Sequence, residues 1–186
     1  MANRSYLYGH KEGATPEHRD LGEWRTNVPL SHLLLVGTDP TPVASAIWSV
    51  EEKIALSGDA ARGRELMAAF LDWLEPQMTA HAEEFARKKE EVLELLGRRQ
   101  DDRFHLELGE IFQLGGYELS EMESETQYYA RNAASLVQDV ERLLDTPGST
   151  VADANDWLVK EATDMHESLG LSFLGILYFH LGEVAS

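Results

Sequence analysis

The stretch "DRFHLELGEIFQLGG", residues 102–116, decides the fold that the sequence predicts. On a helix with a step of about 100° per residue, four apolar side chains fall within one arc of roughly 100°: Phe104, Leu108, Ile111 and Phe112. The stretch ends at Gly115 and Gly116, which are typical of a helix C-terminus and the turn after it. The pattern therefore favours a helix.

The same stretch contains the first candidate site, formed by His105, Glu107 and Glu110. On a helix, His105 and Glu107 lie at opposite margins of the apolar arc, and Glu110 lies about 140° from His105. We therefore expect His105 to tune packing or hydrogen bonding at a helix margin and not to act as a catalytic base. A strand over 103–108 is the alternative, in which His105 and Glu107 share the outer face and a site becomes possible again.

Further helices are predicted wherever a polar cap residue precedes a stretch of periodic apolar residues. Helices are expected at 30–36, from Thr41 to Gly58, from Asp59 to Pro76, at roughly 80–96, from Ser120 to about Leu144, and after Thr150. Ser120 with Glu123 has the spacing of a capping box, and Thr150 with Asp153 is a weaker version of it.

The two ends of the chain carry the strand signals. "SYLYG", residues 5–9, is short and aromatic, and "ILYFHL", residues 176–181, is its evident partner by β propensity. A helix is nevertheless the simpler prediction for 171–181. The predicted fold class is thus mainly α, an all-alpha single compact domain over residues 1–186. A minor short N-terminal strand is an alternative that the sequence does not decide.

Charge and composition exclude several classes of function. The 186 residues include 16 basic and 33 acidic ones, which gives a formal net charge of −17, and the chain has no cysteine. Such a charge repels nucleic acid and anionic membranes. The sequence contains no run of eighteen uncharged apolar residues, the length that a membrane-spanning helix needs. The lack of cysteine excludes disulfides and thiolate chemistry. We expect a cytoplasmic protein that binds neither nucleic acid nor membrane.

Motifs for catalysis and for cofactor binding are missing from the sequence. There is no HExxH motif and no phosphate-binding Gly-rich loop, and "GLSFLG" at 170–175 has one residue too many for a nucleophile elbow. His81 with Glu84, and His180 with Glu183, could each supply two metal ligands, but such pairs arise by chance in a chain rich in glutamate. We predict no cofactor, no metal and no catalytic residue.

Several motifs together resemble a known group of proteins. They are "MANRSYLY" at 1–8, "SAIWSVEEKIALSGD" at 45–59, "FLDWLEP" at 70–76, "FHLELGEIFQLGG" at 104–116 and "LYFHLGE" at 177–183. The chain is similar in them to uncharacterised bacterial proteins that begin with nearly the same residues. The resemblance covers most of the chain and implies a bacterial origin, but it implies no activity.

Surface character supports the leading hypothesis, an acidic protein-binding module, with an immunity or antitoxin-like protein as one form of it. Its partner would be a protein with a basic surface, which the negative charge would attract. The nominated contact residues are Glu118, Glu121, Glu123, Glu125, Trp24 and Arg25. For Trp24 the competing interpretation is structural: it anchors an irregular segment to the helical body.

The alternative hypothesis is an enzyme or a small-molecule binder. Its pocket would combine histidines and carboxylates that folding brings together: His105, Glu107, Glu110, His166 and His180. The oligomeric state and the identity of any partner do not follow from the sequence.

Overall fold

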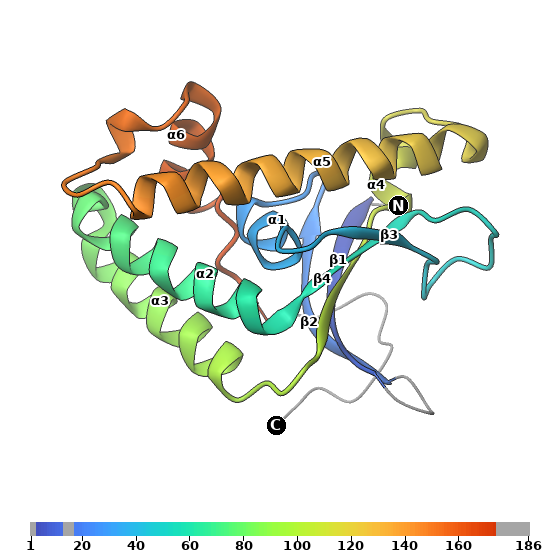
Figure 1. Ribbon diagram of the computed structural model, residues 1–186, viewed down its shortest axis with the longest axis horizontal. Helices are drawn as coiled ribbons and strands as arrows, with labels where there is room; N and C mark the ends of the chain where they lie inside the picture. The colour runs from blue at the N-terminus through green and yellow to red at the C-terminus, as the bar shows by residue number, and fades with distance from the viewer. Residues whose placement is uncertain (1–2, 13–16, 174–186) are drawn as a thin grey trace.

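The computed structural model describes residues 3–12 and 17–173, and in these ranges the chain has a mixed α/β fold (Figure 1). One antiparallel sheet has the strand order β2-β1-β5-β4-β3. The strands are β1 (Arg4–Lys11), β2 (Glu17–Arg25), β3 (Thr41–Val43), β4 (Ala55–Asp59) and β5 (Arg103–Glu107). The prediction of a mainly α domain with a minor strand is therefore wrong.

The helices gather on one side of the sheet. They are α1 (Leu30–Val36), α2 (Ala60–Leu74), α3 (Ala82–Gly97), α4 (Gly109–Leu114), α5 (Leu119–Leu144) and α6 (Asp156–Thr163), with short 3₁₀ turns at Glu75–Gln77, Thr79–His81 and Val151–Asp153. Figure 1 shows α5 running over α1, with α6 beside its C-terminal half and α4 near its N-terminal end. Helices α1, α2 and α5 contact one another and the sheet.

The hydrophobic core lies between these helices and one face of the sheet. Leu7, Leu106 and Leu56 are paired across three neighbouring strands and are fully buried. They belong to the same core cluster as the apolar residues of α1, α2 and α5. Gly58 permits the close approach of β4 to α1, because a Cβ there would lie 2.2 Å from the Val36 carbonyl oxygen.

Two predicted helices are strands. Residues 103–107 form β5, and a helix resumes only at α4; the segment predicted as a helix from Thr41 to Gly58 contains β3, a loop and β4. Strand β5 lies between β1 and β4, so both of its backbone edges are hydrogen-bonded. This pairing outweighs a local apolar spacing that imitates a helix, because strand formation depends on neighbouring strands more than on intrinsic preference.

Other local predictions are confirmed. Helix α1 covers residues 30–36, α3 and α5 match their predicted ranges to within two residues, and the Asp59 side chain caps α2 by accepting from the Arg62 N–H. The predicted strand at 5–9 is part of β1, whose described neighbours are β2 and β5. The proposed partner at 176–181 lies outside the described residues.

Both predicted capping boxes have counterparts in the structure, but one is formed by other residues and the other opens a different element. The capping box of α5 is made by Glu118 and Glu121 and not by Ser120 and Glu123. Thr150 and Asp153 do form a capping box, but it opens only the 3₁₀ turn Val151–Asp153, and the helix that follows has its own cap. Local polar spacing thus located the N-cap of α5 to within two residues, whereas α6 begins six residues after Thr150.

Candidate functional site

The sheet face opposite the core is polar. Side chains alternate between the two faces of a strand, so Tyr6, Tyr8 and His10 of β1 share this face. Their partners on β5 are Glu107, His105 and Arg103, in that order. The sheet register thus places a row of tyrosines beside a row of histidine and glutamate.

His105 and Glu107 form a buried hydrogen-bonded pair, so the predicted divergence of the two side chains on a helix is wrong. The His105 imidazole Nε2 lies 2.8 Å from Glu107 Oε1, and the two residues are 6% and 2% exposed. The Glu107 carboxylate also accepts from the Ser45 hydroxyl at 2.6 Å and from the Ala46 N–H at 2.5 Å. Glu107 therefore ties the loop before β4 to the centre of the sheet.

Two further histidines stand next to this pair. The His18 ring centroid lies 4.9 Å from that of His105 and 4.7 Å from that of His10. Burial lowers the pKa of His18 to about 4, and the neighbouring rings of His105 and His10 act in the same direction. Burial likewise lowers the pKa of His10. The environment thus favours the neutral form of both rings.

Glu110, the third residue of the candidate stretch, has a different role. Its carboxylate accepts from the Tyr6 hydroxyl at 3.0 Å and from the Arg4 N–H at 2.9 Å. Burial raises the pKa of Tyr6, and the hydrogen bond to Glu110 raises it further. Glu110 therefore fastens α4 to β1.

The remaining members of the predicted His/Glu pocket do not join this face. His166 lies after α6, where it approaches His81 and Glu84 of the α3 N-terminus. His180 is outside the described residues. The structure thus unites His105 and Glu107 and gives His166 other neighbours. The His81–Glu84 spacing was visible in the sequence, but no local signal connected it to His166.

The nominated acidic residues mark the start of α5. Glu118 is the N-cap, its N–H donates to the Glu121 carboxylate at 2.9 Å, and Glu123 and Glu125 follow within the first two turns. Large apolar side chains are exposed beside them: Leu114, Tyr117 and Leu119. Acidic and apolar groups therefore share this end of the helix.

Sequence reasoning missed a groove between α5 and α6. It has a volume of about 600 Å³, and its lining includes Asn27, Tyr128, Asp139, Trp157 and Glu161. Tyr128 is 52% exposed and Trp157 is 47% exposed. Among the described residues, the lining contains no Lys, Arg or His. The groove is therefore aromatic and acidic.

Trp24 and Arg25 belong to β2 and not to an irregular segment, which corrects that prediction. The Trp24 indole N–H donates to the Glu167 carbonyl at 3.0 Å, while Arg25 is exposed. Both line a cavity of about 640 Å³ that also reaches Asn27 and His166. Trp24 therefore anchors the edge of the sheet to the segment after α6.

Comparisons with known proteins identify the family but no activity. A family model described as a domain of unknown function, DUF7822, matches residues 6–168, so the chain belongs to that family. No curated protein and no solved structure matches. Among the helices of the described ranges, none has the length and apolar character that crossing a membrane requires.

Proposed function

We propose that this protein is an acidic binding module that docks a basic protein partner along α5 and in the α5–α6 groove. The observation that carries the proposal is the exposure of Tyr128 and Trp157 in a groove with acidic side chains. Aromatic residues are enriched among the side chains that dominate binding energy. The net charge of −17 adds long-range attraction for a basic surface.

The exposed face of α5 connects the acidic N-terminus to the groove. Glu121, Tyr128 and Ser135 are spaced by seven residues, so they lie on nearly one line of the helix. Asn132 and Asp139 lie about 40° and 20° from that line at 100° per residue. All five are exposed or half-buried. A helix of 26 residues is about 39 Å long, which gives an extended partner room to bind.

The groove offers complementary chemistry to a lysine or arginine of the partner. A cation between Tyr128 and Trp157 would gain cation–π attraction, and Glu161 supplies a carboxylate. Asp139 already accepts from Arg142 and Asn155. Glu161 is therefore the principal charged contact.

An immunity or antitoxin-like protein is one form of this function. Such a protein must reach its partner quickly, and opposite charges raise the association rate. An acidic surface with aromatic anchors suits the coverage of a basic partner such as a nuclease.

Affinity capture followed by kinetics tests the proposal. The full chain is used to recover its partner from native cells, and association is then measured by surface plasmon resonance at low and high salt. We expect Trp157→Ala to weaken binding at least tenfold, mainly through faster dissociation, as for a buried anchor. We expect Glu121→Lys with Glu125→Lys to slow association, and added salt to slow association of the wild type.

A matched charge reversal serves as the control. Glu83→Lys with Glu90→Lys changes the net charge equally but lies on α3. It should affect association less than the α5 pair. An acidic or nucleic-acid partner, association that is independent of salt, or equal effects of the two charge reversals would contradict the proposal.

A small-molecule binder that uses the polar sheet face is the second candidate. One observation favours it: His10 Nδ1 is buried and has no hydrogen-bond partner among the described residues, and the His10 ring lies beside that of His18, which in turn lies beside that of His105. Such a ligand would raise the melting temperature of the wild type and not that of His10→Phe. A panel of small polar metabolites in a thermal-shift assay would test this.

A further inference from the structure

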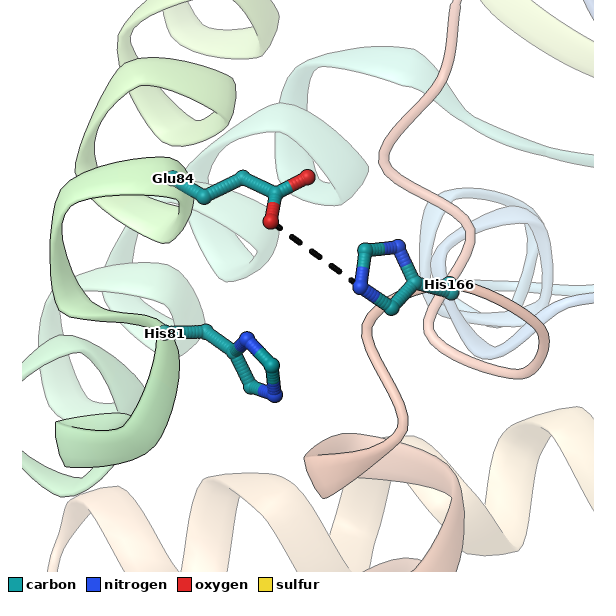
Figure 2. Close-up of side chains that lie close together, drawn as sticks. All are labelled: His81, Glu84 and His166. Atoms are coloured by element: carbon teal, nitrogen blue, oxygen red, sulfur yellow. Dashed lines mark ion pairs between the residues drawn. The ribbon is translucent and has the colours of Figure 1, made fainter.

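We propose that His81, Glu84 and His166 form a metal site that binds one Zn²⁺ through two imidazoles and one carboxylate. Their donor atoms all lie within 4.8 Å of one another. Figure 2 shows His81 and Glu84 at the start of α3, with His166 approaching from the segment after α6. The site goes beyond the proposed binding function, and it departs from the metal-free expectation based on the sequence.

The donor atoms are available for a metal. The His166 Nε2 lies 3.9 Å from Glu84 Oε2, which is too far for a hydrogen bond, and the two imidazole rings meet at 85° with centroids 5.6 Å apart. Within the described residues, none of the three side chains makes a hydrogen bond to another group. A metal would therefore replace only the ion pair between His166 and Glu84 that Figure 2 marks.

The backbone on both sides of the site is anchored. His81 is the N-cap residue of α3, and Glu84 follows three residues later in the first turn of that helix. Their side chains are therefore neighbours on the helix surface. Near His166, the Leu169 N–H donates to the Asp164 carbonyl at 2.8 Å, and the Trp24 indole holds the Glu167 carbonyl. Met165 and Ser168 on either side are buried. The side chains can rotate while their attachment points stay in place.

The donor set matches zinc better than calcium or magnesium. Zn²⁺ binds imidazole nitrogen and carboxylate oxygen at about 2.0–2.2 Å, and two histidines with one glutamate leave its fourth position to water. Calcium and magnesium prefer oxygen ligands alone. In a tetrahedral zinc site the donor atoms are about 3.3 Å apart. Rotation of the exposed His81 and His166 side chains can close the remaining distance.

Titration of the full chain with ZnCl₂ tests the site. Untagged, chelator-treated protein is measured by isothermal titration calorimetry, and we expect one Zn²⁺ per chain. Glu84→Gln and His166→Ala should each weaken binding at least tenfold. Glu83→Gln, an exposed acidic neighbour in the same helical turn, should bind like the wild type. Circular dichroism without metal confirms that each variant is folded.

Cobalt supplies a readout of the ligands themselves. Co²⁺ in place of Zn²⁺ should give the intense visible absorption of a tetrahedral site in the wild type and lose it in His166→Ala. Absence of Zn²⁺ binding by the wild type, or equal affinity in the wild type, Glu84→Gln and His166→Ala, would overturn the proposal. Neither result depends on a protein partner, so the proposed function is tested separately.

Discussion

The described part of the chain contains two histidine clusters with different surroundings: the sheet cluster of His10, His18 and His105, and the α3 cluster of His81 and His166. His105 of the sheet cluster is 6% exposed and shares the carboxylate of Glu107 with two groups of the Ser45 loop. The side chain of His166 is 61% exposed, and its Nε2 lies 3.9 Å from Glu84 Oε2. The same residue types thus form a closed network in one place and an open set of donors in the other.

The difference in burial predicts different roles for the two clusters, one in the stability of the fold and the other in binding. A buried polar network is costly to disturb, because a group that loses its partner stays out of water. An exposed cluster is cheap to disturb, because water replaces each partner. We therefore expect the sheet cluster to hold the fold and the α3 cluster to serve binding. Three experiments test this contrast, in order of decreasing effect on stability.

The largest effect is expected from Glu107→Ala. The substitution leaves the His105 ring, the Ser45 hydroxyl and the Ala46 N–H without their common acceptor. A buried polar group that loses its hydrogen-bond partner costs about 1–3 kcal/mol, so we expect the loss of an acceptor shared by three groups to cost about 3 kcal/mol or more. Urea unfolding followed by circular dichroism measures the free energy of unfolding. A loss under about 1 kcal/mol would show that the network does not hold the fold.

A smaller and pH-dependent effect is expected from His18. The unfolded histidine binds a proton near pH 6.5, whereas the pKa of the folded one is about 4, so the unfolded state binds more protons between these values. The free energy of unfolding should therefore fall as pH falls from 6.5 towards 4, by at most about 1.4 kcal/mol per pH unit for this residue.

His18→Gln tests this pH dependence. Unfolding measured at pH 7, 6 and 5 should give a shallower loss of stability in the variant than in the wild type. Fully buried His32, whose pKa burial lowers to about 3, adds to the slope of both proteins, so the comparison isolates His18. Identical slopes would contradict the closed environment described for the sheet cluster.

The smallest effect is expected from His166→Ala without metal. Substitutions at exposed positions usually change the free energy of unfolding by less than about 0.5 kcal/mol. His105→Ala, measured in parallel, should cost several times more because it opens the buried network. If the two substitutions cost the same, the distinction between the clusters fails.

The sequence predicted part of each candidate site. The strand alternative for 103–108 correctly placed His105 and Glu107 on one face, but the apolar spacing across 104–112 favoured a helix, because the spacing combines residues of β5 and α4. The His81–Glu84 pair was recognised from its spacing. His166 could not be added to it, since a separation of 82 residues carries no local signal.

What the sequence by itself determined is local. Asp59 caps α2, the aromatic run at 5–9 forms part of β1, and the periodicity of 120–144 gives α5, because caps and amphipathic spacing act within a few turns. The tertiary structure decided that residues 103–107 are a central strand, which supplies hydrogen bonds to two neighbours that are distant in the chain. It also decided which histidines are enclosed and which remain open, since burial depends on the packing of the whole chain.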